Sequence, residues 1–539
     1  MTAGGGEKRR KGVTTGSSSS SSSSSGEGSI PALSFESDFE EGNLMRAIRV
    51  GPTEYDLILH PDTNTNGFTQ WFYFGVQHMR AGQTYTFNII NNEKSSSVFN
   101  DGMRPVIFSA KEHKATGQGW GHSTSTSSAK HQPSPPSASA TASTTTTTSS
   151  SSSSSPSSSS PDTFYTLSMS MKFPHTEDYV RLAYFYPFTY SYNRAFLRSI
   201  QSNKRASSYM YRQSLCRTRG NNVVELLTIT DFGSSSPAGS SSSSNNSNNC
   251  SGGGEIAICS RPIVFLSSRV HPGEANSSWV MKGIIQFLTG ESKEARFLRQ
   301  NAVFKIVPIL NPDGVINGNY RCNLSGVDLN RHWENPCPIK HPTIFAVKQL
   351  LSALARQRPV MLYCDFHGHS VMKNFCLYGC NDSEAQIKPL REDEIFPMML
   401  SNRAPDLFQF SDCKFSVLKR KKGSARVVFW RELRIWNSYT MEASFCGSNM
   451  GPLKGQHYTT RDFERMGKAF CQTIYDWLSP DRSSVYRAIQ EVTKRILAAE
   501  RERARKKKSK SAVVRVPTNR RSSQLRRQSS RKLQARGST

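Results

Sequence analysis

The chain has 539 residues, 36% of them hydrophobic, and a formal net charge of +28 at pH 7. Its length predicts more than one domain, and without a run of about 18 apolar residues it offers no membrane-spanning helix. The basic N-terminus lacks the apolar stretch of a signal peptide, and the 11 scattered cysteines indicate reduced thiols in the cytosol or nucleus.

Low-complexity tracts occupy three parts of the chain. Serine fills residues 17–25, and Ser, Thr, Asn, Pro and Gly dominate tracts at about 114–161 and 234–254. Segments of this composition bury too little apolar surface to offset the entropy that is lost on ordering. We therefore predict a disordered N-terminus over residues 1–30 and two loop insertions without fixed structure.

The region 31–215 is predicted to form a small antiparallel β-sandwich that carries the first insertion in one of its loops. Strands are expected where β-branched and aromatic residues form short runs bounded by Asn, Gly, Asp and Pro. Such runs lie at 55–59, 70–76, 84–90, 165–171 and 180–185. The aromatic-rich stretch 184–192 is expected to pack against the next domain, and a rim that faces substrate is the alternative.

From residue 216 to 480 the pattern changes to buried strands separated by helices. Helical spacing is found at 278–288, 342–354 and 459–478. Between the helices are largely apolar runs, typical of strands that are covered on both faces, at 223–229, 263–266, 303–307 and 360–364. The alternation predicts an α/β/α sheet domain, and the second insertion falls within it.

Residues 481–539 are predicted to form a charged helix that ends in a basic tail. From Arg501 onward there are 15 Lys and Arg and one acid, so half of the net charge lies there. One interpretation of such a tail is a solvated, disordered end. The other is a segment for nuclear import or for adhesion to nucleic acid, membrane or an acidic protein tail.

The motif His271-Pro-Gly-Glu274 is the first with catalytic character. It follows a predicted strand, as do His367 and Glu442, and open α/β sheets place their sites at this edge. Two imidazoles and one carboxylate suit a catalytic zinc ion that keeps one position open. A second carboxylate could then accept a proton from water. An isolated His-x-x-Glu pattern is weak evidence, because a chain of this size contains one by chance.

A second group of polar residues lies between these motifs. Asn311-Pro-Asp-Gly314 is typical of an ordinary turn, and Arg321, Asn330 and Arg331 follow it. Two guanidinium groups and an amide suit an anionic substrate, because an arginine can bind a carboxylate through two parallel hydrogen bonds. The alternative for each arginine is a surface ion pair.

In their order along the chain, these motifs resemble those of the zinc carboxypeptidase family, and the surrounding sequence resembles its cytosolic carboxypeptidase subfamily, nearest to the type 1 members. The resemblance covers about residues 31–480 apart from the two insertions. It implies an α/β/α mixed-sheet domain preceded by a small antiparallel β-sandwich, with one Zn²⁺ per chain. The stretches that carry it lie at 35–44, 71–74, 268–274, 305–319, 363–370, 425–432 and 438–442.

The resemblance also implies roles for individual residues. His271, Glu274 and His367 are implied as the zinc ligands. Glu442 is implied as the general base that activates water and then protonates the leaving amine. Arg321 is implied to polarise the scissile carbonyl group and to stabilise the oxyanion.

Three more residues are implied to bind substrate. Asn330 and Arg331 would hold the free α-carboxylate of the C-terminal residue, and Arg426 matches the basic residue of the side-chain pocket. The mobile tyrosine of the family has no clear counterpart, since its usual place falls in the basic run 419–422. Tyr439 is expected to lie in the sheet instead.

Three residues near the motifs have competing interpretations. His369 is expected to support the site rather than to bind metal. Cys376 and Cys380 flank a short Leu-Tyr-Gly segment, and a metal site there would need a second closely spaced pair. We therefore predict that both are buried structural thiols.

The implied function is the removal of C-terminal or side-chain-linked glutamate from polyglutamylated tubulin and other acidic protein tails in the cytoplasm. The positive body would favour the encounter, and the basic tail could hold the protein on microtubules, with cytoskeleton or nucleus as further locations. No membrane partner is expected. A non-catalytic adaptor for acidic tails or microtubules is one alternative, although Glu442 and the ligand set are intact. A nucleic-acid-binding protein that acts through residues 501–539 is another.

Overall fold

The structure is a computed structural model that describes residues 14–16, 30–124, 126–134, 164–233, 258–381 and 392–513. The predicted insertion at 234–254 and the tail beyond residue 513 lie outside the described residues, as do most of residues 1–30. The chain separates into two compact units, Met1–Ala488 and Ile489–Thr539. Within the described ranges, no helix is both long enough and apolar enough to cross a membrane.

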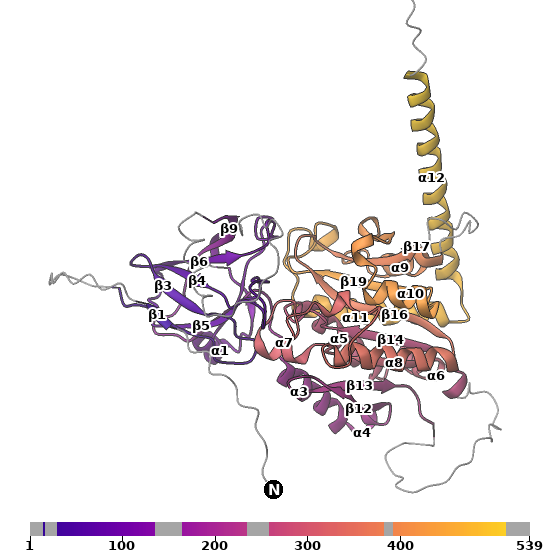
Figure 1. The fold of residues 1–539 in the computed structure, drawn as a ribbon, viewed down its shortest axis with the longest axis horizontal. Helices are drawn as coiled ribbons and strands as arrows, with labels where there is room; N and C mark the ends of the chain where they lie inside the picture. The colour runs from indigo at the N-terminus through magenta and orange to yellow at the C-terminus, as the bar shows by residue number, and fades with distance from the viewer. Residues whose placement is uncertain are drawn as a thin grey trace, which may run out of the picture. The chain divides into compact units, whose positions relative to one another are not determined.

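The N-terminal part of the first unit is a β-sandwich (Figure 1). Its elements are β1 (Thr14–Gly16), β2 (Ser34–Glu36), β3 (Arg46–Arg49), β4 (Glu54–Ile58), β5 (Tyr73–Gln77), β6 (Thr84–Asn92), β7 (Val106–Ser109), α1 (Ala110–Thr116), β8 (Gly121–His122), β9 (Thr126–Pro133), β10 (Tyr165–Lys172) and β11 (Val180–Ala183). One sheet has the order β1-β3-β4-β6-β10-β9 and the other β2-β5-β11-β7-β8. Along β6, Tyr85, Phe87 and Ile89 are buried, because alternate residues of a strand point to the same face.

The first low-complexity tract is shorter than predicted. Strand β9 lies inside it and pairs antiparallel with β10, from Tyr165↔Pro133 to Met171↔Thr126. The prediction of one continuous loop insertion at about 114–161 is therefore wrong for this half. A β-ladder is held by backbone N–H and C=O groups, and a Ser- and Thr-rich segment supplies these as well as an apolar one does. Strand β1 likewise pairs with β3 and lies within the predicted disordered N-terminus.

The second part of the first unit is built on an eight-stranded sheet. Its elements are α3 (Tyr190–Ser202), α4 (Lys204–Ser207), β12 (Met210–Arg217), β13 (Val223–Ile229), β14 (Ile263–Ser268), α5 (Ala275–Leu288), α6 (Lys293–Asn301), β15 (Val303–Val307), α7 (Pro312–Asn317), α8 (Pro342–Gln357), β16 (Val360–His369), β17 (Phe375–Asn381), α9 (Glu392–Arg403), β18 (Lys414–Ser416), α10 (Ala425–Leu433), β19 (Ser438–Ser444) and α11 (Thr460–Leu478). Helix α12 (Ser483–Val513) begins in the first unit and continues into the second. The order is β12-β13-β15-β14-β16-β19-β17-β18. Strand β12 belongs to this sheet, so the domain begins before the predicted boundary at residue 215.

Helices cover both faces of the eight-stranded sheet, as the alternation of strands and helices predicts. On β14, Val264 and Leu266 pack in one apolar cluster with α5 and α11. Ile263 and Phe265 point to the other face and pack in a second cluster with α8 and α10. The four central strands β15, β14, β16 and β19 run parallel to one another, so their carboxyl ends meet at one edge.

The aromatic stretch after β11 packs against the eight-stranded domain. The ring centroids of Tyr184 and Phe185 lie 5.1 and 5.3 Å from that of Phe445, which follows β19. Phe188 makes an edge-to-face contact with Trp279 of α5 at 5.0 Å. These contacts confirm the predicted packing role of the stretch, and the apolar cluster is continuous across the two domains.

A buried ion pair also joins the two domains. Arg269, two residues before the His271 motif, donates to Glu41 Oε1 at 2.6 Å, and the side chains are 0% and 1% exposed, respectively. The guanidinium group of Arg269 also donates to the carbonyl oxygens of Pro272 and Phe188. Because these acceptors surround one cation, the pair fixes the turn that carries His271 against the β-sandwich.

Replacing Glu41 by Gln would leave the guanidinium group of Arg269 buried without its counter-charge. We expect the free energy of unfolding to fall by about 3–5 kcal/mol, the usual cost of breaking a buried pair. Denaturant unfolding followed by tryptophan fluorescence measures this change. The control is Asp38→Asn, which removes an exposed carboxylate from the same segment. If the two variants were equally stable, the ion pair would not have this role.

Candidate active site

The first pair of predicted ligands lies in the turn between β14 and α5. His271 follows β14, and Glu274 is the residue that directly precedes the first turn of α5. Only glycine fits at position 273 between them, because a Cβ atom there would lie 2.7 Å from the ring of Tyr320. The Gly273 N–H donates to the Tyr320 carbonyl oxygen at 2.9 Å.

The other two predicted residues lie side by side in the sheet. His367 of β16 and Glu442 of β19 are direct partners in the parallel register of these strands. The apolar run at 360–364 predicts that His367 lies just beyond the strand. Strand β16 instead continues to His369, so His367 lies inside it. The run ends early because the residues near the carboxyl end of β16 are polar ones that serve the site.

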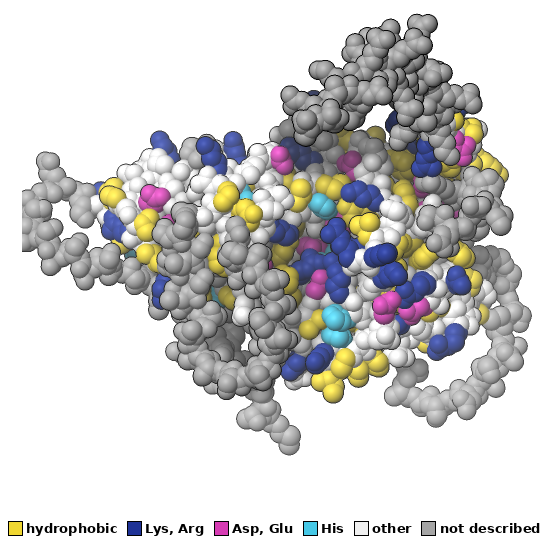
Figure 2. Space-filling model, turned by 45° about the horizontal axis from the view of Figure 1, so that its top comes forward, with side chains coloured by type: hydrophobic (Ala, Val, Ile, Leu, Met, Phe, Trp, Pro, Cys, Tyr) yellow, Lys and Arg dark blue, Asp and Glu magenta, His cyan; other side chains and the backbone are white. Residues whose placement is uncertain are grey.

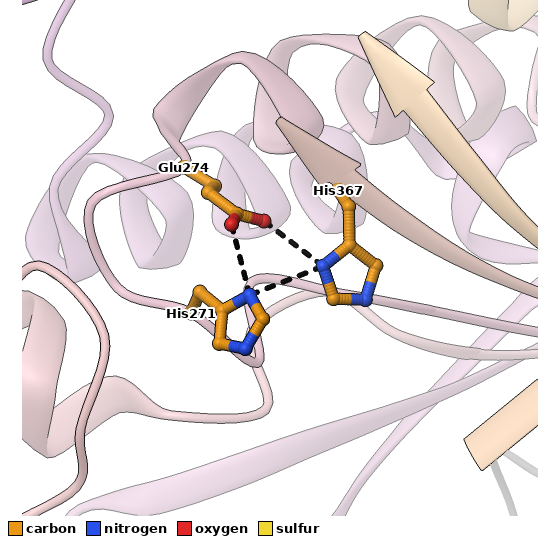
Figure 3. Close-up of side chains that lie close together, drawn as sticks. All are labelled: His271, Glu274 and His367. Carbon is orange, nitrogen blue, oxygen red and sulfur yellow. Dashed lines mark hydrogen bonds and ion pairs between the residues drawn. The ribbon is translucent and has the colours of Figure 1, made fainter. Parts of the chain in front are cut away.

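The side chains of His271, Glu274 and His367 converge on one point (Figure 3). His271 Nδ1 lies 2.8 Å from Glu274 Oε1, and His367 Nδ1 lies 2.9 Å from Glu274 Oε2. The two Nδ1 atoms are 3.2 Å apart. All three side chains are buried. Four-coordinate zinc with bonds of about 2.0–2.1 Å separates neighbouring donor atoms by roughly 3.3 Å, so the spacing of this group fits zinc.

Each imidazole is also held by a carboxylate on its far side. Asp328 Oδ1 lies 3.0 Å from His271 Nε2, and Asp365 Oδ2 lies 2.7 Å from His367 Nε2. A carboxylate at Nε2 keeps the proton on that nitrogen and leaves the lone pair of Nδ1 available to a metal ion. Both Nδ1 atoms face the point of convergence, so the tautomer and the orientation of each ring are those that metal binding requires.

The charges of the group also favour a cation. Burial alone would raise the pKa of Glu274, but the neighbouring imidazoles His271 and His367 hold it well below its ordinary value. Burial alone would lower the pKa of His367, but Asp365 and Glu274 raise it well above its ordinary value. Three carboxylates thus surround two imidazoles. Arg321 balances the charge of Asp328, and a dication would balance Glu274 and Asp365 without adding protons to the ligands.

Glu442 is not part of the metal-binding group, and its pKa is shifted in the opposite direction to that of Glu274. Burial raises the pKa of Glu442 to about 7, while the imidazole of His367 opposes the rise and the carboxylate of Glu274 adds to it. A carboxyl group whose pKa lies near neutrality can both accept and return a proton. Its place beside His367 puts that proton transfer next to the metal-binding group.

Asp328 connects the metal-binding group to the arginines. Its Oδ2 accepts hydrogen bonds from Arg321, at 2.8 Å from Nε and 2.7 Å from Nη2, and lies 3.8 Å from Arg331 Nε. Arg331 Nη1 donates to the carbonyl oxygen of Asn330 at 2.8 Å. Asn330 Nδ2 lies 3.3 Å from His367 Nε2. The predicted carbonyl-polarising and carboxylate-binding residues are therefore brought together with the ligands.

Arg426 of α10 is buried, with 6% of its surface exposed. Its Nη1 donates to the Gly379 carbonyl oxygen and lies 3.2 Å from Cys380 Sγ. Its Nε is buried and has no hydrogen-bond partner within the described residues. A guanidinium group that lacks a carboxylate partner and borders a cavity is suited to bind an anion from outside.

The backbone that precedes and carries Arg321 is held by the β-sandwich. Asp62 is 1% exposed and lies beyond β4. Its Oδ1 accepts the N–H of Tyr320 at 2.5 Å, and its Oδ2 accepts those of Arg321 at 2.7 Å and Cys322 at 2.6 Å. Three successive N–H groups directed at one carboxylate fix the conformation of this segment.

The residues with competing interpretations behave as structural groups. His369 Nδ1 accepts the N–H groups of residues 371 and 372, at 3.2 and 3.0 Å. Cys376 and Cys380 are buried on β17, and the described cysteines form no disulfide. Tyr439 is fully buried in β19, as predicted. The Asn-Pro-Asp-Gly motif begins α7, and the Asn311 side chain accepts the Gly314 N–H at 3.1 Å, which is the predicted turn.

All eight predicted site residues line one cavity of about 560 Å³. Sequence reasoning missed Asp328, Asp365 and Lys94 as parts of the site. The role of Asp365 could have been predicted, because residues two apart on a strand share a face and Asp365 precedes His367 by two. No local pattern marks Lys94, which comes from the β-sandwich and lines the same cavity.

Comparison with known proteins agrees with the fold. Residues 194–453 match the model of the zinc carboxypeptidase family, and residues 35–135 match that of the cytosolic carboxypeptidase N-terminal domain. The chain belongs to the zinc carboxypeptidase family. Within that family, it has the N-terminal domain of the cytosolic carboxypeptidases.

Individual cytosolic carboxypeptidases are similar to most of this chain. Cytosolic carboxypeptidase 3 of Mus musculus is 38% identical over 462 residues, which are 85% of this chain and 42% of the relative. Cytosolic carboxypeptidase 1 of Gallus gallus is 40% identical over 458 residues, 82% of this chain and 35% of the relative. The chain thus spans less than half the length of these curated relatives, and their similar identities leave the type 1 resemblance a prediction.

A solved metallo-carboxypeptidase from Burkholderia cenocepacia has the same fold. It superposes with a TM-score of 0.60 at 19% identity and covers 82% of this chain and 98% of its own. The agreement in fold covers both the β-sandwich and the α/β/α domain, since the matched share of this chain exceeds either domain alone.

Replacing Asp365 by Asn tests how the metal-binding group is assembled. An amide cannot keep the proton on His367 Nε2 as a carboxylate does, so Nδ1 loses part of its preference for metal. We expect the affinity for zinc to fall about 10–100-fold, measured by competition with a chelator. Asp101→Asn, at an exposed position, is the matched control. Equal affinities in the two variants would contradict the role of Asp365.

Proposed function

We propose that this chain is a zinc-dependent carboxypeptidase that releases glutamate from the ends of acidic protein tails. One observation carries the proposal: groups with complementary chemistry line a single cavity. They are the metal-binding residues His271, Glu274 and His367, the carboxyl group of Glu442, the guanidinium groups of Arg321, Arg331 and Arg426, and the amide of Asn330.

The residues of the cavity can perform peptide hydrolysis by ordinary acid–base chemistry. A bound zinc ion would polarise the scissile carbonyl group and make the attacking water more acidic. Glu442 would accept the proton from that water and later deliver it to the leaving amine. Arg321 would donate hydrogen bonds to the carbonyl oxygen as it gains negative charge, and Asp328 already holds its guanidinium group in place.

Selection for a chain end follows from the carboxylate-binding residues. Asn330 and Arg331 would bind the free α-carboxylate, because an amide and a guanidinium group are neighbouring donors there. An internal peptide bond has no such carboxylate and would leave these donors without an acceptor. The proposal therefore includes exopeptidase and not endopeptidase activity.

Preference for glutamate is supported by the charge of the cavity wall. Seven Lys and Arg residues and only two Glu residues line it. In Figure 2, Lys and Arg side chains gather near the middle of the face that is shown, around acidic side chains. Within this wall Arg426 lines the cavity with a guanidinium group that suits the carboxylate of a glutamate side chain.

The substrate class that best fits these features is the polyglutamylated tail of tubulin or of another acidic protein. A cationic cavity attracts a polyanionic chain over distances of about the Debye length, which raises the rate of encounter. The relatives are named cytosolic carboxypeptidases, and we propose a cytoplasmic location for this chain, with attachment to microtubules through the basic tail.

Two substitutions separate metal binding from proton transfer. Glu442→Gln should retain zinc and lose turnover about 10²–10⁴-fold, because it removes only the base. His271→Ala should lose both zinc and turnover. Zinc content is measured by elemental mass spectrometry, and glutamate release by mass spectrometry of polyglutamylated tubulin tails.

Unchanged turnover in Glu442→Gln would overturn the proposed role of this residue. The wild-type protein itself distinguishes an enzyme from a non-catalytic adaptor. Zinc-loaded protein that bound acidic tails without releasing glutamate would favour the adaptor.

Replacing Arg426 by Met tests the glutamate preference. We expect kcat/KM for a peptide with C-terminal glutamate to fall roughly tenfold to hundredfold, the value of a hydrogen bond to a charged group. A peptide with C-terminal leucine should lose little. Arg431→Met, at an exposed position on the same helix, is the control. Equal losses on both peptides would show that Arg426 supports the fold and does not select the side chain.

A further inference from the structure

Lys94 is a cation that the β-sandwich contributes to the cavity. It lies just beyond β6, is partly buried, and lines the cavity beside Tyr320 and Ser370. Its Nζ donates to the Tyr320 hydroxyl group and, at 2.8 Å, to Ser370 Oγ. The segment that follows is also fixed here, since the Val98 N–H donates to the Ser370 carbonyl oxygen at 3.3 Å.

The ammonium group of Lys94 has capacity for one more acceptor. An ammonium group carries three N–H donors, and two of them reach hydroxyl groups. Within the described part of the chain, no carboxylate lies within ion-pair distance of its Nζ. Burial lowers the pKa of Lys94 to about 8, and the charges of Glu274, Arg321 and Glu442 influence that pKa as well. The cation is therefore close to the reacting centre and incompletely paired.

The place of Lys94 relates it to a particular part of the substrate. This step rests on the proposed function, in which Asn330, Arg331 and Arg426 hold the terminal residue. Arg426 comes from α10 and contacts β17, whereas Lys94 contacts Tyr320 and Ser370, which form a different part of the wall. A substrate whose terminal residue is held by Arg426 would place the residue before the scissile bond at another part of the wall, and Lys94 lines such a part.

We infer that Lys94 is a specificity-determining residue that binds the side-chain carboxylate of the penultimate residue of the substrate. The β-sandwich would in this way select for an acidic residue before the cleaved bond, while Arg426 binds the side chain of the terminal residue. The hydroxyl groups of Tyr320 and Ser370 position the ammonium group. Loss of the cation should then weaken selection between substrates more than it weakens turnover itself.

The test compares two peptides that end in glutamate and differ only in the penultimate residue, Glu or Gln. Wild-type protein should prefer the Glu peptide roughly tenfold to hundredfold in kcat/KM. Lys94→Met should bring this ratio close to one, and Lys94→Arg should restore most of it. Lys172→Met makes the same change at an exposed position of the β-sandwich and should keep the wild-type ratio.

Binding gives a second readout that does not depend on turnover. In Glu442→Gln protein loaded with zinc, the affinities for the two peptides should show the same preference, and adding Lys94→Met should remove it. If the wild-type protein released no glutamate but this binding preference were present, the proposed activity would fail and the role of Lys94 would stand.

Two results would overturn the inference itself. One is wild-type protein without preference between the peptides in either readout. The other is an equal loss on both peptides in Lys94→Met, which would show that Lys94 only joins the two domains.

Discussion

The proton positions on two imidazole rings are the constraint on which the rest of the site depends. His271 and His367 can present Nδ1 to a metal ion only while Asp328 and Asp365 keep the protons on Nε2. These two carboxylates are costly to bury, and each has further donors that offset the cost. Arg321 donates to Asp328, and the Ser267 hydroxyl group donates to Asp365 at 2.8 Å.

The charges of the cavity fall into two sets. Carboxylates lie around the metal-binding group, where a small dication can balance them, and cations line the walls, where a larger anionic substrate can reach them. Asp328 belongs to both sets, because it contacts the ligand His271 and the wall residue Arg321. Through this carboxylate the geometry of the metal-binding group and the position of the Arg321 guanidinium group are linked.

Much of this arrangement could be predicted from the sequence because its signals are local. The apolar runs specify the central strands, and polar residues at strand ends specify where the site lies. Strand β9 could not be predicted, since its pairing relies on backbone groups and its Ser- and Thr-rich sequence has no apolar alternation. The contacts of Lys94 with Tyr320 and of Asp328 with His271 span 226 and 57 residues, and only the tertiary fold brings such partners together.

Asp62 has a consequence for where a working fragment of this chain can begin. The segment of Arg321 depends on a carboxylate that lies 259 residues earlier, in the other domain. A fragment cut at the start of the zinc carboxypeptidase match would keep every metal ligand and still leave three backbone N–H groups without their acceptor. The limits of the family match and the limits of the structural unit that holds Arg321 are therefore different, because the latter includes the β-sandwich.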